Sequence, residues 1–247
     1  MKLLRQPTLW SMLLFLLFWQ LGTLALGAMR LPGPVMVMRT LVDATASGEL
    51  LYHLGITLAR VGAAFVLAML LGSAIGILLG RRKRVDRFFN SWLITLLNIP
   101  ALVIIILSYV WFGLVEAAAI AAVVVNKVPN VAVIMREGAR AMNRDYTELA
   151  QVYRFGYWKT LRHVTLPQLY PYLMASARTG LSLIWKIVLV VELLGRSNGM
   201  GFQLHLFFQL FDVASILAYT LAFVLVIQAI ELAVLRPLDS AARRWRR

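Results

Sequence analysis

The residues of this chain that could do chemistry are suited to recognition and not to covalent catalysis. The sequence contains no Cys, which excludes a thiolate nucleophile, a thiolate metal site and a disulfide framework. His53, His163 and His205 are too far apart to match a His-based metal site. No GxxxxGK(S/T), HExxH or GxSxG motif occurs. We therefore expect no enzyme and no metal site in this chain, and energy from ATP would have to come from a partner.

A second group of polar residues lies inside otherwise apolar segments. Such side chains must face protein or water, because exposing them to lipid is costly. The cations among them would favour an anionic solute, and a buried pair of Lys186 with Glu192 is the alternative explanation. For Arg60 the alternative is a long side chain that reaches the membrane interface. The residues that we expect to line a path are Asn98, Asn126, Lys127, Asn130 and Lys186, with Arg60 and Glu192 as weaker candidates.

The composition places these residues in a membrane protein. Of the 247 residues, 61% are hydrophobic, whereas soluble domains contain about 45–50%, and the mean hydropathy is +0.77. The net charge of +14 arises from 25 Lys and Arg residues against 11 Asp and Glu residues. Because cytoplasmic loops of membrane proteins collect Lys and Arg, this excess needs no nucleic-acid partner.

Six apolar segments are long enough to cross a bilayer about 30 Å thick as helices. They predict an all-α, polytopic integral membrane protein with a single transmembrane domain over residues 1–247. The run 98–100, Asn-Ile-Pro, predicts a kink or break in the third segment. Gly72, Gly76 and Gly80 predict the close approach of another helix to the second. The expected spans are residues 8–29, 54–80, 88–112, 117–135, 172–194 and 213–235.

The basic residues predict how these spans are oriented. Most of the 25 Lys and Arg residues fall on the side of the loop 136–171, whereas Arg30, Arg39 and Arg196 fall on the other side. Since Lys and Arg accumulate in cytoplasmic loops, we expect this loop and both termini in the cytoplasm. The first span, 8–29, is longer than the apolar region of a typical signal peptide, which favours an uncleaved helix over a cleaved leader.

The loop 136–171 is polar, basic and aromatic. Asp145 followed by Glu148 predicts a helix start, with the aspartate as its cap. Gly156 predicts a bend in this helix or its end, and Pro167 suits the first turn of the next. Apolar residues at spacings of three and four share one face, so we expect two short amphipathic helices on the membrane surface. Such helices suit resting on anionic lipid and docking on a partner equally well.

The run ELAQVYRFGYWKTLRHVTLPQLYP, residues 148–171, resembles the cytoplasmic signature loop of the permease subunits of binding-protein-dependent ABC importers. The glycine of the family pattern falls on Arg154, and Gly156 stands two residues later. The resemblance extends over roughly residues 10–240 and is greatest to the nitrate, sulfonate and taurine branch, through LPGPVMVMRTLVDATASGELLYHLGITLARV, YVWFGLVEAA and ELLGRSNGMGFQL. The matching residues in the loop are Glu148, Ala150, Trp158, Arg162, Leu166, Pro167 and Pro171.

This resemblance implies a coupling helix that inserts into a groove of a separate ATPase subunit, which binds the ATP and Mg. It implies a multi-pass permease of the bacterial cytoplasmic (inner) membrane for a small anionic solute such as nitrate, a sulfonate or a taurine-like compound. The implied partners are the ABC ATPase, a second permease copy in a homodimer, an external solute-binding protein and membrane lipid. The implied coupling residues are Glu148, Ala150, Arg154, Gly156, Tyr157, Trp158, Arg162 and Pro167.

An ion-coupled secondary transporter is the alternative function. It would require inverted repeats and intramembrane acids that bind ions or relay protons. The sequence has no evident internal repeat, and Glu192 and Glu231 lie near the ends of spans. The sequence therefore favours the importer permease.

Overall fold

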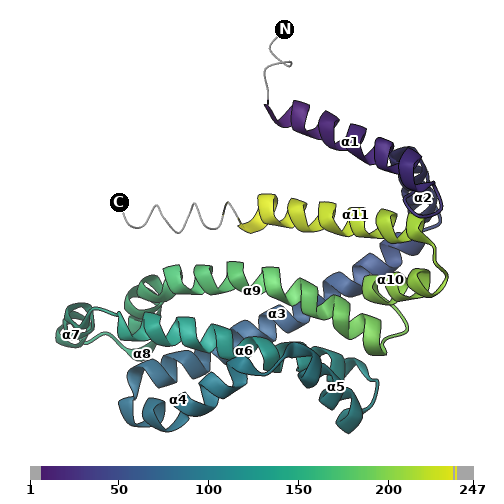
Figure 1. Cartoon of the computed structure of the whole chain (residues 1–247). Coiled ribbons are helices and arrows are strands. Elements are labelled where there is room, and N and C mark those ends of the chain that lie inside the picture. The colour runs from purple at the N-terminus through teal and green to yellow at the C-terminus, as the bar shows by residue number, and fades with distance from the viewer. Residues whose placement is uncertain (1–6, 236, 238–247) are drawn as a thin grey trace.

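The computed structural model describes residues 7–235 and 237, and this part of the chain is helical throughout its regular elements (Figure 1). The predicted all-α class is confirmed. The helices are α1 (Pro7–Leu26), α2 (Pro34–Ala46), α3 (Glu49–Arg81), α4 (Lys83–Asn98), α5 (Ala101–Phe112), α6 (Glu116–Arg140), α7 (Arg144–Val152), α8 (Tyr157–Thr160), α9 (Leu166–Gly195), α10 (Met200–Gln209) and α11 (Val213–Ile230), with π-helical turns over Leu161–Thr165 and Glu231–Leu235.

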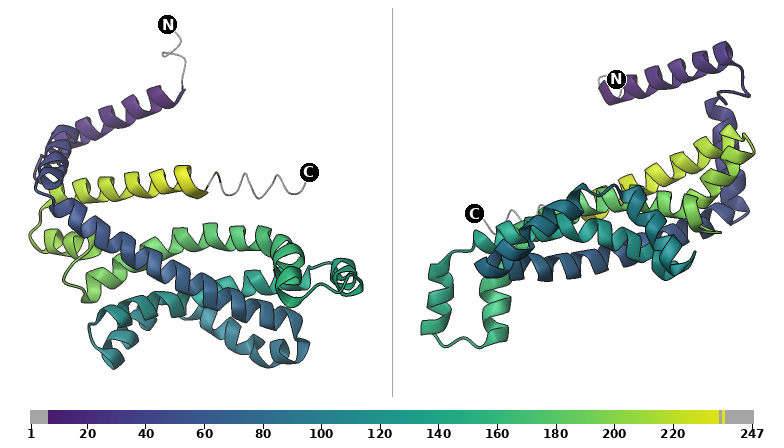
Figure 2. Two further views of the ribbon diagram at one scale, coloured as in Figure 1. Left: turned by 180° about the vertical axis from the view of Figure 1, so that it is seen from behind. Right: turned by 60° about the horizontal axis from the view of Figure 1, so that its bottom comes forward.

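Helices α3, α6 and α9 pack along one another and form the centre of the bundle (Figures 1 and 2). Helix α5 packs on α6, α10 packs on α9 and α11, and α11 packs on α2. Helix α1 stands apart from the centre and contacts α2. The Trp19 indole N–H donates to the carbonyl of Pro32, in the connection before α2, at 2.9 Å. The bundle has two ends, which we call the α7 end and the α10 end after the helices that lie there.

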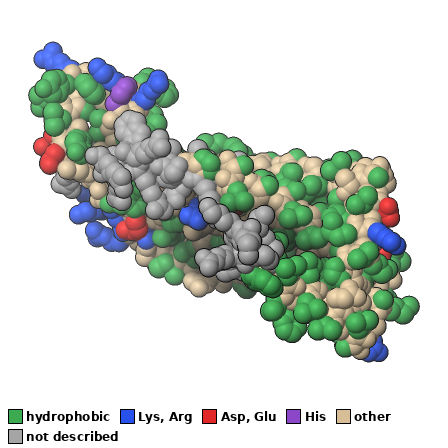
Figure 3. All heavy atoms as spheres, turned by 90° about the horizontal axis from the view of Figure 1, so that it is seen from above, with side chains coloured by type: hydrophobic (Ala, Val, Ile, Leu, Met, Phe, Trp, Pro, Cys, Tyr) green, Lys and Arg blue, Asp and Glu red, His purple; other side chains and the backbone are tan. Residues whose placement is uncertain are grey.

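Charge is distributed unevenly between these two ends. Figure 3 shows most of the visible Lys and Arg side chains at the α7 end, with hydrophobic side chains over the middle of the molecule. An apolar middle with charged ends is the pattern of a protein embedded in a bilayer, because charged side chains are excluded from hydrocarbon.

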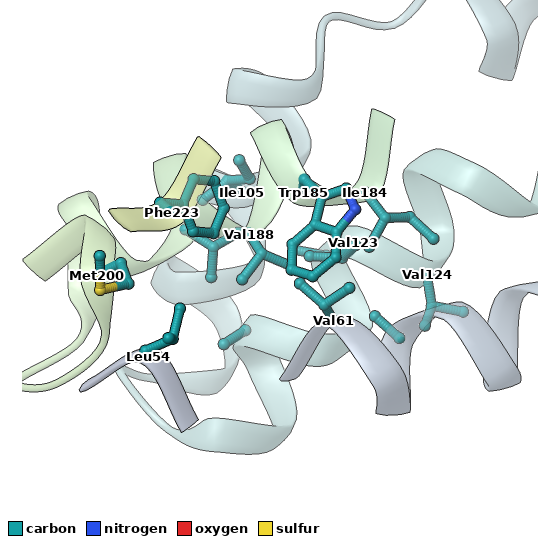
Figure 4. Close-up of a cluster of buried hydrophobic side chains, with 14 of the residues drawn as sticks. Leu54, Val61, Ile105, Val123, Val124, Ile184, Trp185, Val188, Met200 and Phe223 are labelled. Carbon is teal, nitrogen blue, oxygen red and sulfur yellow. The ribbon is translucent and has the colours of Figure 1, made fainter. Parts of the chain in front are cut away.

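The core of the bundle is centred on Trp185 of α9 (Figure 4). Its ring meets the Phe223 ring of α11 edge to face, with the centroids 5.6 Å apart. Val61 of α3 and Val123 of α6 belong to the same buried cluster. Aromatic pairs of this geometry add to the energy gained from burial, so this cluster joins four helices into one core.

Three glycines let α3 and α6 approach closely, as their spacing predicted. A Cβ built on Gly76 would lie 2.5 Å from the Ala132 carbonyl oxygen, and one on Gly80 would lie 2.6 Å from the Ala139 Cβ. Real Cβ atoms do not come this close to backbone, so only glycine fits without moving α6. The prediction that another helix approaches Gly72, Gly76 and Gly80 is confirmed.

The number of membrane-crossing helices agrees with the sequence only in part. Helices α3 and α6 and the segment Val213–Ala233 are long and apolar enough to cross a bilayer, and α4 with α5 adds a fourth crossing if the two are counted as one span. The apolar part of α1, Trp10–Leu26, is shorter, and α9 carries Arg178, Lys186 and Glu192 along its length. The structure supports a polytopic helical protein without confirming six as the number of spans.

The expected third span, residues 88–112, is two helices and not one. Helix α4 ends at Asn98, α5 begins at Ala101, and their axes differ in direction by 95°. Ile99 is extended, with ψ at 125°, because the ring of Pro100 disfavours helical geometry in the preceding residue. The predicted break is confirmed in position, and the two helices are either one broken span or a re-entrant loop.

We expect Gly76→Ala to lower the free energy of unfolding by about 1–3 kcal/mol, the usual range for overpacking. The added Cβ would push against the backbone of α6. The matched control is Gly55→Ala on the same helix, where a Cβ meets nothing within 4 Å and alanine favours the helix. Thermal unfolding of both variants in detergent provides the measurement. Equal stability of the two variants would show that the α3–α6 contact is looser than the structure indicates.

Candidate coupling loop, ion cluster and solute path

Helix α7 projects away from the bundle formed by α3, α6 and α9 (Figures 1 and 2). It begins at Arg144, and its cap is the Asn143 side chain, which accepts a hydrogen bond from the Asp145 N–H at 2.9 Å. The Asn143 N–H in turn donates to the Gln168 side chain of α9 at 2.8 Å. The expectation that Asp145 caps this helix is therefore wrong. Asparagine caps a helix as well as aspartate does, and Asn143 is also bound to α9.

Helix α7 ends in a turn at Arg154, whose φ of 50° is left-handed. The Arg154 N–H donates to the Gln151 carbonyl at 2.9 Å, and the Phe155 N–H donates to the Ala150 carbonyl at 2.8 Å. These two bonds form a Schellman motif, in which the left-handed residue is usually glycine. The residue on which the family glycine falls therefore has the backbone conformation that favours glycine.

Gly156 lies before the start of α8 and not at the end of α7. It precedes α8 with an extended backbone, at φ −66° and ψ 165°. The expectation that Gly156 bends or ends the first helix is wrong, because α7 has already ended at Val152. Pro167 lies in the first turn of α9, as expected.

The loop exposes a set of apolar side chains, which we call the aromatic patch: Leu149, Val152, Tyr153, Tyr157 and Trp158. Tyr157 and Trp158 are 73% and 77% exposed, and their rings meet edge to face at 5.6 Å. Glu148, Arg154 and Arg162 are also exposed, whereas Ala150 is buried. Contiguous apolar side chains at a surface mark an interaction site, and Trp, Tyr and Arg are typical anchors of interfaces.

The residues expected to line a path occupy two different environments. Lys127 of α6 is 2% exposed and lies against Gly180 of α9, with no acidic partner among the described residues. Lys186 is exposed on α9. Asn126 and Asn130 are half-buried beside Lys127 on α6, and the exposed Asn98 donates to the Ile94 carbonyl of its own helix at 2.8 Å. The α6 residues are thus buried or half-buried, whereas Asn98 and Lys186 are exposed.

A buried ion cluster lies at the α10 end, and its centre is Arg60 of α3, which is 4% exposed. Its guanidinium donates to Glu192 of α9 at 2.8 Å and to both carboxylate oxygens of Glu116 of α6 at 2.6 and 2.9 Å. It also donates to the Asn198 carbonyl at 2.9 Å. One side chain of α3 thereby binds α6, α9 and the loop that follows α9.

Glu192 is completely buried and is satisfied by further donors. Its carboxylate accepts from the Thr57 hydroxyl at 2.9 Å and from the Gly201 N–H at 2.8 Å. The Gly199 N–H donates to His53 at 2.9 Å and connects α10 to the same cluster. A buried charge is tolerated when a partner and hydrogen bonds satisfy it, as here.

The alternative that pairs Glu192 with Lys186 is wrong, because Glu192 pairs with Arg60. Arg60 itself is 4% exposed and bound within the cluster. The sequence did contain a signal for the cluster, since Arg60 and Glu192 are opposite charges near the outer ends of two expected spans. Glu116 and Asn198 lie in connections between spans, and their part in the cluster had no sequence signal of its own.

The fold is that of the membrane-spanning permease subunits of ABC transporters. It is similar to a chain of an inward-facing MetNI methionine ABC transporter, with a TM-score of 0.63 and 18% sequence identity over 77% of this chain and 93% of that one. The family described as binding-protein-dependent transport system inner membrane component matches residues 68–247, and the chain belongs to this family. It is a component of an importer, and an ion-coupled transporter is not favoured.

Several relatives are named for small anions. SsuC of Bacillus subtilis, named as an aliphatic sulfonates transport permease protein, is 31% identical over 188 residues, which cover 75% of this chain and 68% of the relative. The bicarbonate permease CmpB and the nitrate import permease NrtB of Synechococcus elongatus are 28% and 26% identical over 200 residues. Those matches cover 76% of this chain, with 72% of CmpB and 71% of NrtB.

The costs of replacing Arg60 and Glu192 should not add, because the two side chains are a coupled buried pair. We expect Arg60→Met to cost about 3–5 kcal/mol of unfolding free energy, because the buried Glu192 loses its counter-charge. Arg60→Met with Glu192→Leu should cost clearly less than the sum of the two single changes, since Glu116 is half-exposed and can be solvated. Denaturant unfolding in detergent measures all three variants. Strict additivity would mean that Arg60 and Glu192 are not coupled.

Proposed function

We propose that two copies of this chain form the permease of an ABC importer that carries a small anionic solute through the bacterial inner membrane. A separate ATPase subunit would bind the ATP and Mg, and an external binding protein would deliver the solute. The observation that carries the coupling part of this proposal is the exposed aromatic patch on the loop that turns at Arg154.

The orientation that we propose places the α7 end and both termini in the cytoplasm. The clustering of Lys and Arg at the α7 end supports it, because cytoplasmic loops are enriched in these residues (Figure 3). This orientation puts the aromatic patch on the side where ATP is available. The Arg60 cluster would then lie on the external side.

The aromatic patch would dock in a groove of the ATPase. Its side chains are exposed in this chain, so docking gains the energy of burying them without disturbing the bundle. The turn at Arg154 is fixed by two backbone hydrogen bonds, and Asn143 binds α7 to Gln168 of α9. Movement of the ATPase could therefore reach α9 through rigid contacts.

We expect Trp158→Ala to abolish most co-purification of the ATPase while leaving the stability of the permease unchanged. Trp158 is 77% exposed, so its loss removes an interface anchor and leaves no cavity in the core. The matched control is Trp111→Ala on α5, another tryptophan that is 68% exposed and far from the loop in sequence. Tagged permease is purified from cells that co-express the ATPase, and the bound ATPase is quantified. Equal retention by both variants would argue against docking at this patch.

The solute path would lie between two permease copies. Thr179, Ser182 and Lys186 are exposed on α9 at spacings of three and four residues, so they form a polar stripe on one face. Polar side chains in the middle of an apolar helix avoid lipid and face protein or water. A second copy facing this stripe would enclose a hydrophilic passage, with Lys127, Asn126 and Asn130 of α6 as further candidate contacts. The two lysines and the anions named for the relatives favour an anionic solute.

We expect Lys186→Met to reduce uptake of the anion by about tenfold or more. The lysine would attract the anion to the path, and this attraction is strong where little water screens the two charges. Lys186→Arg retains the charge and should retain most of the uptake. Lys127→Met tests the second cation in the same way. Uptake of labelled nitrate, bicarbonate and an alkyl sulfonate is measured in vesicles with the complete transporter. Unchanged uptake in both methionine variants, with normal insertion, would refute the anion path.

A further inference from the structure

A basic pocket lies between α3, α4 and α6 at the α7 end, and the proposed transport function makes no use of it. Its volume is about 890 Å³, within the range of about 300–1,000 Å³ that is common for small-molecule sites. Leu79 and Met142 contribute to an apolar part of the lining. The polar lining consists of Arg81, Lys83, Asp86, Arg87, Asn90 and Arg140.

Asp86, the acidic residue in this lining, is already neutralised. One carboxylate oxygen accepts from Arg136 at 3.1 Å, and the other accepts from Arg140. Arg136 also donates to the Asn90 side chain at 2.7 Å, which fixes the wall formed by α4 and α6. The remaining cations of the pocket therefore have no share of this carboxylate.

Three cations in the pocket have no acidic partner in the part of the chain that the structure describes. Arg81 reaches the Thr165 hydroxyl at 3.4 Å, which is a neutral acceptor. Lys83 and Arg87 have no acidic partner among the residues that the structure describes. These side chains are exposed, so their charges are available to an anion that enters the pocket. Three cations at a pocket entrance are suited to a phosphate group.

Exposed aromatic residues lie on the opposite face of α4 from the pocket. Phe88, Phe89 and Trp92 are all exposed, and the two phenylalanine rings meet edge to face at 4.9 Å. They follow the basic residues within the first turns of the helix. A helix with a basic start and exposed aromatic residues is typical of the boundary between headgroups and acyl chains.

We propose that this pocket binds the headgroup of an anionic phospholipid. Its phosphate would lie among Arg81, Lys83 and Arg87, and Leu79 and Met142 would contact its apolar part. The position favours a lipid, because the pocket lies at the end of α3, a helix of membrane-crossing length, where headgroups are found. Basic pockets between membrane helices are known to select anionic headgroups. The inference depends neither on the solute nor on the ATPase.

The test compares two variants of equal charge. Lys83→Gln with Arg87→Gln removes two cations of the pocket, and Arg82→Gln with Arg84→Gln removes two cations of the same loop that do not line it. The complete transporter is reconstituted in nanodiscs of phosphatidylcholine with phosphatidylglycerol, re-extracted in detergent, and analysed for retained lipid by native mass spectrometry. We expect about tenfold less retained phosphatidylglycerol for the pocket variant than for the control.

Other outcomes would overturn the proposal. Equal loss in both variants would indicate diffuse attraction by the basic loop, and no retention by the unaltered protein would indicate no site. Displacement of the lipid by inorganic phosphate would indicate a site for a free anion. Loss of the ATPase in place of the lipid would indicate a partner surface. The exchange Lys83→Arg with Arg87→Lys keeps both charges and should keep the lipid, which separates loss of binding from faulty folding.

Discussion

The bonds of Arg60 to Glu192 and Glu116 are the interaction on which the arrangement of the helices depends at the α10 end. The residues belong to α3, α9 and α6, and Arg60 and Glu192 are separated by 132 positions in the chain. Arg60 and Glu192 are both buried, and either charge would be prohibitively costly to bury alone. Arg60 of α3 can therefore be buried only where α9 and α6 bring their carboxylates to it.

The close α3–α6 contact complements this cluster toward the other end of the bundle. Where Gly72, Gly76 and Gly80 face α6, backbone meets backbone and side chains cannot adjust. The pair of helices is thus joined by charge near the α10 end and by close packing from its middle to the α7 end. Two helices joined in this way resist movement relative to each other, because a close-packed contact is not continuously deformable.

Much of the fold and part of the candidate site could be predicted from particular residues. The spacing of Gly72, Gly76 and Gly80, the break before Pro100 and the position of Pro167 are local properties, and each was predicted correctly. The turn at Arg154 was not predicted, because an arginine gives no local signal for a left-handed backbone. Only the hydrogen bonds that close α7 show why this position favours glycine.

By itself the sequence determined the helical membrane class and the apolar segments, because hydropathy and charge are sums over neighbouring residues. The family followed from the resemblance of residues 148–171 to a known motif. Only the tertiary structure decided which partner Arg60 takes, that Lys127 is buried while Lys186 is exposed, and that α4 and α5 diverge by 95°. The physical reason is that the energy of a buried charge depends on what packs around it. Those neighbours come from helices far apart in the chain.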